Sequence, residues 1–82
     1  MEYLGERISV VASFGLRERL RPVKFMWSER VVQVKDVTYR WTEMEGQAKV
    51  YHFSVTDGST LYELSFNASA IGWKLERVET DV

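Results

Sequence analysis

The side chains in this sequence that could bind an anion are eleven Lys and Arg residues, and seven of them lie between positions 17 and 40. They are densest in LRERLRPVK (16–24), where Glu18 is the one carboxylate among four cations. Lysine and arginine side chains on a small β-sheet can follow a phosphate backbone, although runs of this kind are most often solvated surface. The candidate nucleic-acid-binding residues are Arg17, Arg19, Arg21, Lys24, Arg30, Lys35 and Arg40.

The charge is distributed unevenly along the 82 residues, although the net charge is only -1. Residues 1–41 contain eight Lys or Arg and five Asp or Glu, whereas residues 42–82 contain three and seven. A nearly neutral protein of this kind can still present a basic patch to an anionic partner.

Catalytic residue types are few. His52 is the only histidine, and the expected strand pairing sets it opposite Glu63. Such a pair could transfer protons, but a cross-strand pair at the surface is the commoner structure. The sequence has no cysteine, no nucleophile elbow and no phosphate-binding glycine loop, and Glu43 and Glu45 flank a turn, where carboxylates are usually solvated. We therefore predict that the protein is not an enzyme and holds neither a metal nor a cofactor.

Alternating apolar and polar residues recur along the chain, which is typical of β-strands that bury one face. The pattern predicts an all-β fold of about six antiparallel strands in a mainly meander order, with no helix. A strongly curled sheet or small open barrel would cover the many aromatic side chains of a chain that is 45% apolar. Residues 1–82 are expected to form a single small β domain.

The first hairpin is predicted to pair Trp27 with Val32. This leaves residues 28–31 as a four-residue loop, because Glu29 and Arg30 suit the positive φ of a two-residue type I′ turn poorly.

The apolar phase then changes along the next strand. Val34 belongs to an even-numbered apolar series, whereas Tyr39 and Trp41 belong to an odd-numbered one. A strand cannot change parity without an extra residue, so we predict a β-bulge near Lys35 and Asp36.

Two later turns are predicted in the same way. Tyr39 is expected opposite Tyr51, across a three-residue loop in which Gly46 has a left-handed conformation. A tight turn at Asp57-Gly58 is expected to place Phe53 opposite Tyr62.

Large apolar side chains are expected to share one core, which leaves few aromatic rings free to stack on bases. Tyr3 and Met26 are the exceptions. The alternation leaves open whether the first strand (8–14) closes onto the last strand or pairs with the second. Val23 is expected on the same face of its strand as Phe25 and Trp27. The predicted core residues are Phe25, Trp27, Tyr39, Trp41, Tyr51, Phe53, Tyr62, Leu64, Phe66, Trp73 and Leu75.

The first ten residues contain acidic side chains and no long apolar run, so we expect no signal peptide. No apolar run is long enough to cross a membrane as a helix. A cytoplasmic location is therefore expected, and a membrane is not an expected partner.

Seven parts of the chain form a recognisable set: YLGERISV (3–10), RPVKFMW (21–27), VQV (32–34), Trp41, YHFSVTDG (51–58), YEL (62–64) and GWKL (72–75). Together they resemble a bacterial domain family of unknown function. Its members are short stand-alone proteins or form the C-terminal piece of ImuB-type proteins, the catalytically inactive, Y-family polymerase-like subunits of a mutagenic repair complex. The resemblance covers nearly the whole chain and implies an association with DNA repair for the fused members. Relatives usually carry a basic residue and a glycine where this chain has Ser28-Glu29.

These features favour two functional hypotheses. The first is a non-catalytic binding module that associates with nucleic acid through the basic segment from Arg17 to Arg40. The alternative is a protein-interaction or self-association domain that uses an exposed edge of the first or second strand for strand addition. A protein partner or a homo-oligomer is then expected in place of nucleic acid.

Overall fold

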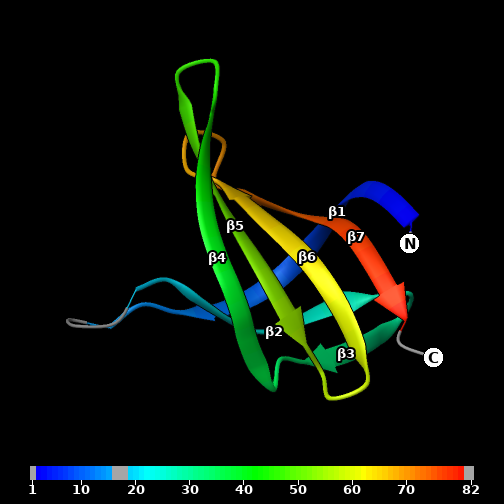
Figure 1. Ribbon diagram of the computed structural model, residues 1–82. Helices are drawn as coiled ribbons and strands as arrows, with labels where there is room; N and C mark the ends of the chain where they lie inside the picture. Colours follow the sequence, from blue (N-terminus) through cyan, green and yellow to red (C-terminus); the bar gives the residue numbers. More distant parts are fainter. Residues whose placement is uncertain (1, 16–18, 81–82) are drawn as a thin grey trace.

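The computed structural model describes residues 2–15 and 19–80, and these residues form β-strands and their connections (Figure 1). The predicted all-β, antiparallel fold is confirmed, with seven strands where about six were expected. The extra strand arises because Val34 and Lys35 interrupt the segment that was expected to be one bent strand. Residues 2–15 and 19–80 include no helix that could span a membrane. The strands are β1 (Glu2–Ser13), β2 (Arg21–Trp27), β3 (Arg30–Gln33), β4 (Asp36–Glu45), β5 (Ala48–Thr56), β6 (Thr60–Asn67) and β7 (Gly72–Thr80).

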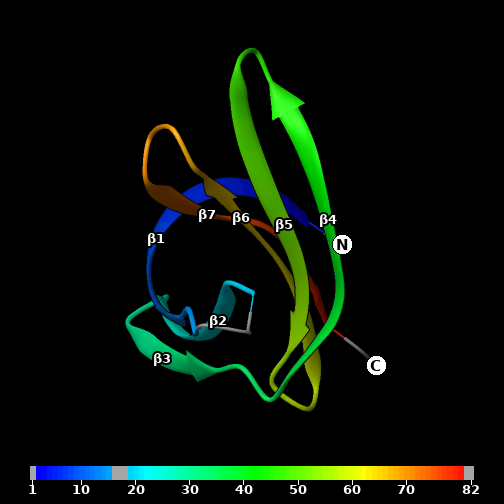
Figure 2. The same cartoon turned by 90° about the vertical axis from the view of Figure 1, so that its left-hand side faces the viewer.

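The strands form one sheet in the order β3-β2-β1-β7-β6-β5-β4, and neighbouring strands are antiparallel. β1 pairs with β7 through residues 2–8 and with β2 through residues 9–13, so both pairings that the sequence left open are present. The sheet curls into a half-barrel around a central space (Figure 2). The backbone N–H of Lys35 donates to the carbonyl of Thr56 at 2.8 Å, which ties the β3–β4 connection to the end of β5.

The β1–β2 ladder contains an irregularity that changes which side chain of β2 is buried. The register shifts between Val11 and Ala12, so that Val23 is the extra residue. Pro22 and Phe25 are buried, whereas Val23 is exposed. The prediction that Val23 shares the face of Phe25 is therefore wrong, because a single extra residue turns a strand over.

A second irregularity lies in β4, close to the predicted bulge but not at it. The chain leaves strand geometry at Val34 and Lys35, and the register of the β4–β5 ladder shifts between Val37 and Tyr39. Thr38 is the extra residue, two positions beyond Asp36.

The shift at Thr38 determines which side chains of β4 face inward and which face outward. Beyond it Arg40 is opposite Phe53, a core residue, and therefore faces the interior of the curl. Trp41 is opposite His52 on the outer face, and Tyr39 is 65% exposed. The predicted core positions of Tyr39 and Trp41 are therefore wrong.

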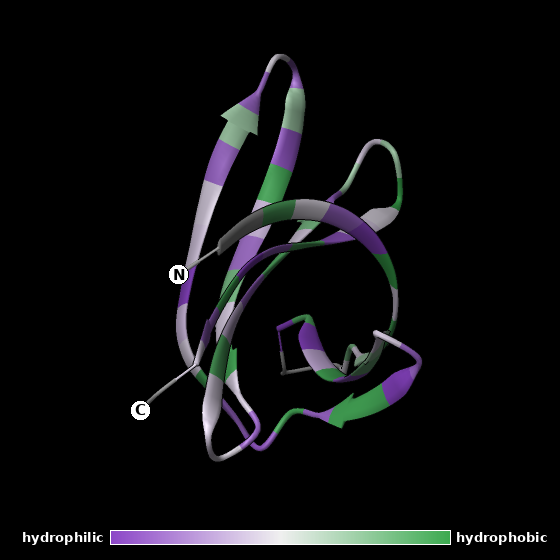
Figure 3. Cartoon of the chain, turned by 90° about the vertical axis from the view of Figure 1, so that its right-hand side faces the viewer, coloured by the Kyte–Doolittle hydropathy of each residue, from purple (hydrophilic) through white to green (hydrophobic). Residues whose placement is uncertain are grey.

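The core lies inside the curl, on the face we call inner. The ring of Phe25 meets that of Tyr62 edge-on, with centroids 5.2 Å apart, and so joins β2 to β6 across the interior. Apolar and polar bands alternate along the strands around this space (Figure 3). The buried cluster comprises Phe25, Val32, Phe53, Val55, Tyr62, Leu64 and Leu75, with Trp27, Tyr51, Phe66 and Trp73 half-buried against it.

The hairpin registers differ from the predicted ones although the faces of β5 and β6 are as expected. Phe53 pairs with Leu64 rather than with Tyr62, a shift of two residues that preserves the face. The β4–β5 turn has two residues, Gly46 and Gln47, rather than three, and Gly46 has the expected positive φ, at 64°.

The β2–β3 hairpin closes through a two-residue turn rather than the predicted four-residue loop. Phe25 pairs with Val32 and Trp27 with Arg30, which leaves Ser28 and Glu29 as the central residues. Their φ values are 55° and 61°, as a type I′ turn requires. This register buries Phe25 against Val32, at the cost of two side chains in a left-handed conformation.

We expect the double substitution of Ser28→Asn and Glu29→Gly to raise the free energy of unfolding by about 1 kcal/mol, because Asn-Gly adopts a type I′ turn with little strain. Urea denaturation followed by circular dichroism measures the change. The control is Gln47→Gly in the other two-residue turn, where φ is not positive and no gain is expected. Equal effects at the two turns would contradict the assigned conformation.

Candidate functional site

A wide groove opens on the inner face of β4, β5 and β6, with the β1–β2 connection on its other side. We call it the inner groove. Its volume is about 900 Å³, and most of its surface is apolar. Its lining includes Phe14, Arg19, Arg40, Tyr51 and Phe66, together with the buried ring of Phe53. Trp41 and His52, which the strand register places on the outer face, also border it.

Aromatic rings from neighbouring strands form the floor of the inner groove. Tyr51 and Phe66 are a cross-strand pair of β5 and β6, with ring centroids 6.5 Å apart. The ring centroid of Phe66 lies 4.9 Å from that of Trp73 on β7, and the ring centroid of Trp73 lies 5.6 Å from that of Phe53. Phe14, on the β1–β2 connection, is 78% exposed. The groove is thus the open end of the core.

Arg40 brings a positive charge into this apolar groove. Its Nη1 donates to the carbonyl of Leu20 at 2.7 Å, a contact that joins β4 to the β1–β2 connection. Its guanidinium carbon lies 5.4 Å from the ring centroid of Phe53, a cation–π distance. These contacts hold the cation against the wall of the groove.

Arg19 and Arg21 flank Leu20 in the chain, so the same hydrogen bond brings them towards Arg40. Burial lowers the pKa of Arg40, and the positive charges of Arg19 and Arg21 lower it further. None of the carboxylates that the structure describes forms an ion pair with these three residues, which we call the arginine cluster. The cluster is therefore a concentration of positive charge that an anion would relieve.

The remaining predicted basic residues do not join the arginine cluster. Lys24 is exposed on β2, and Arg30 lies over Trp27, 5.8 Å from the ring centroid. Lys35 lies against Gly58, at the turn that follows β5. Arg17 lies outside the described residues, so its prediction stays open.

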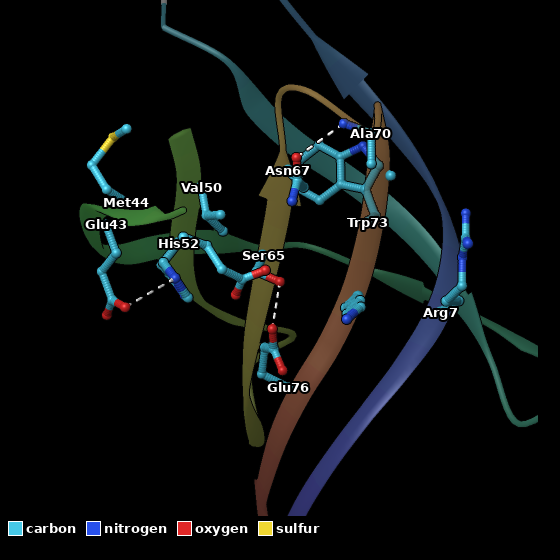
Figure 4. Close-up of a pocket in the computed structure, with 13 residues that line it drawn as sticks. Arg7, Glu43, Met44, Val50, His52, Ser65, Asn67, Ala70, Trp73 and Glu76 are labelled. Atoms are coloured by element: carbon cyan, nitrogen blue, oxygen red, sulfur yellow. Dashed lines mark hydrogen bonds and ion pairs between the residues drawn. The ribbon is translucent and has the colours of Figure 1, made fainter. Parts of the chain in front are cut away.

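A second, polar cleft of about 300 Å³ lies on the outer face and contains His52 (Figure 4). Nδ1 of His52 is 3.6 Å from a carboxylate oxygen of Glu63, and Nε2 is 4.0 Å from one of Glu43. The imidazole stacks on Trp41 with ring centroids 5.0 Å apart. The predicted proximity of His52 and Glu63 is thus present, although the residue directly opposite His52 is Ser65.

The polar side chains around His52 link β5, β6 and β7. Glu63 also forms an ion pair with Arg77 at 2.6 Å, and Ser65 donates its hydroxyl proton to Glu76 at 2.6 Å. Nδ1 of His52 is buried and has no hydrogen-bond partner. Neither carboxylate is within hydrogen-bond distance of the imidazole.

The aromatic residues of the inner groove were not predicted as site residues. The alternation correctly assigns Tyr51 and Phe66 to the core face. Their partial exposure depends on where the curl leaves that face uncovered, and no local sequence signal carries this information.

The described residues contain no group of three His, Asp or Glu side chains arranged to hold a metal ion. No protein-family model, curated protein or solved structure matches the chain. The resemblance to a repair-associated family therefore stays a prediction, and the inner groove is the feature from which a function can be inferred.

Proposed function

We propose that this protein is a non-catalytic binding module that binds nucleic acid at the arginine cluster and the inner groove. The observation that carries the proposal is the convergence of Arg19, Arg21 and Arg40, without a described carboxylate partner, beside an aromatic surface. The family resemblance suggests DNA repair as the process in which this binding takes part.

A nucleotide phosphate suits both the arginine cluster and the apolar surface beside it. A guanidinium binds phosphate oxygens through two parallel N–H groups, and a backbone phosphate is accompanied by a base that can use apolar surface. A local concentration of cations also attracts a polyanion although the whole protein carries a net charge of -1.

Fluorescence anisotropy with a labelled oligonucleotide tests the proposal. Each neutralised phosphate contributes a slope of about -0.7 to log K against log salt for a single strand, so three contacts predict a slope of about -2. The double variant Arg19→Glu, Arg21→Glu should bind roughly tenfold or more weakly, because it reverses both charges at the phosphate contacts.

The matched control is Lys24→Glu, Lys35→Glu, which changes the net charge equally at exposed positions away from the cluster. We expect it to retain most of the affinity. No binding at micromolar protein, a salt-independent affinity, or equal losses in the two double variants would contradict the proposal.

A second candidate function is strand addition, and the observation that favours it is the long edge of β4. β4 is ten residues long, and β5 is its one neighbour among the described strands. The edges expected from the sequence were those of the first and second strands; in the structure β1 pairs with β7 through residues 2–8 and with β2 through residues 9–13, and β2 lies between β1 and β3. Light scattering tests this candidate: a dimer that dissociates in Tyr39→Lys would support it, since lysine on an edge strand opposes pairing.

A further inference from the structure

We infer that the inner groove receives an unpaired nucleobase, stacked against Tyr51 and Phe66, while the adjoining phosphate binds Arg40. This inference depends on the proposed function and specifies the form of nucleic acid that it would bind. It makes the protein selective for single strands or extruded bases over an intact duplex.

Part of the ring surface for such a base is already in place; Nζ of Lys49 lies 5.2 Å from the ring centroid of Tyr51, so a base on this ring would lie beside a further cation. Tyr51 and Phe66 are half-buried, so part of each ring is accessible from the inner groove, and both line it. Their rings are tilted by 41° and packed against each other, and Trp73 supports Phe66 from β7. Rings supported in this way lose little freedom when a base stacks on them. Stacking of one base on an aromatic side chain contributes roughly 1–3 kcal/mol.

The phosphate position is set by the strand register. Arg40 is opposite Phe53 and Thr42 is opposite Tyr51 in the β4–β5 ladder. Arg40 therefore lies two residues, roughly 7 Å, along the sheet from the stacking ring. The contact with Leu20 fixes its guanidinium and leaves other N–H groups for an anion. A base on the ring and its phosphate on the cation can thus be bound by one nucleotide.

The walls of the inner groove explain the preference for an unpaired base. Phe14 and Leu20 on the β1–β2 connection face β4 and β5 across the groove. A volume of about 900 Å³ admits one or a few bases between these walls. The bases of a duplex are stacked on each other and paired, so their ring faces are not available to Tyr51. A fatty-acid carboxylate shares the anionic and apolar character of this ligand, and the test must separate the two.

The experiment compares three ligands: a short oligothymidine, the same strand with abasic sites, and a duplex of equal length. Each is titrated by anisotropy against the wild type and the variants Tyr51→Leu and Phe66→Leu. We expect the abasic strand and the duplex to bind roughly tenfold more weakly than oligothymidine, the change that about 1.4 kcal/mol of lost stacking produces. Each leucine variant should weaken oligothymidine binding by a similar factor and leave abasic binding unchanged.

Tyr39→Leu is the control, because Tyr39 lies on the outer face and should not affect any of the three affinities. Circular dichroism identifies a variant that has unfolded, and the second leucine variant then replaces it. Absence of binding to every nucleic acid would overturn the proposed function together with this inference. Equal affinities for oligothymidine, abasic strand and duplex would overturn the inference alone. Displacement of the strand by micromolar oleate, with unchanged affinity in both leucine variants, would also overturn it.

Discussion

Replacing Phe53 with alanine is expected to lower the free energy of unfolding by about 3–5 kcal/mol. The side chain is 2% exposed and contacts the ring of Trp73 and the guanidinium of Arg40, so its removal leaves a cavity between β4 and β7. A domain of this size has a total stability of roughly 5–15 kcal/mol, so a large part of it would be lost. Urea denaturation of the variant and the wild type measures the difference.

Tyr39→Ala is the matched aromatic control for this prediction. The alternation assigns Tyr39 and Phe53 to the same core, but in the structure Tyr39 is exposed and only its contact with Trp41, at 5.5 Å between centroids, would be lost. We expect a change within about 0.5 kcal/mol, as for other surface substitutions. A loss comparable to that of Phe53→Ala would mean that Tyr39 is a core residue and that the shift at Thr38 is not present.

The contrast between these positions shows how far the sequence determines the fold. A strand pattern with a period of two identifies strands and their buried faces, and for β5 and β6 it places Phe53, Tyr62 and Leu64 correctly on the inner face. It also indicates that a parity change is required near the start of β4. It does not reveal that two irregularities are present, the break at Val34 and Lys35 and the extra residue at Thr38. The second of these exchanges the faces of Arg40 and Trp41 relative to the prediction.

The turns show a related limit. Turn-residue preferences favour a longer loop in the first hairpin, since Ser28-Glu29 is an unfavourable pair for a type I′ turn. The chain nonetheless adopts this turn, with φ values of 55° and 61°, and pairs Phe25 with Val32 in the core. The predicted loop differs by two residues and would keep both side chains on the same face, so the apolar pattern does not distinguish the two registers.

For the candidate site, the sequence identifies the basic segment but not which of its cations come together in the folded protein. The basic run at the start of β2 contributes Arg19 and Arg21 to the arginine cluster. Which of the other cations would join them depends on a hydrogen bond between Arg40 and Leu20, twenty positions apart, and on the curl that brings β4 to the β1–β2 connection. Contacts of this kind belong to the tertiary fold and have no local sequence signal.

Arg40→Met is expected to separate binding from stability. The substitution removes a half-buried charge that has two like-charged neighbours and no described carboxylate partner, and the thioether can still cover the ring of Phe53. The lost hydrogen bond to Leu20 opposes this gain, so we expect the free energy of unfolding to change by less than about 1 kcal/mol.

The affinity of the same variant for oligothymidine should fall roughly tenfold, and the salt slope should become shallower by about 0.7, the contribution of one phosphate contact. Arg40→Lys is the control that retains the charge: it should keep the salt slope but bind more weakly than the wild type, because an ammonium cannot bind phosphate oxygens through two parallel N–H groups. A decrease of several kcal/mol in the free energy of unfolding of Arg40→Met would identify Arg40 as a structural residue. The proposed role of Arg40 in the inner groove requires that it contribute little to stability but much to affinity. Its like-charged neighbours are tolerable in the free protein only when each charge remains partly hydrated.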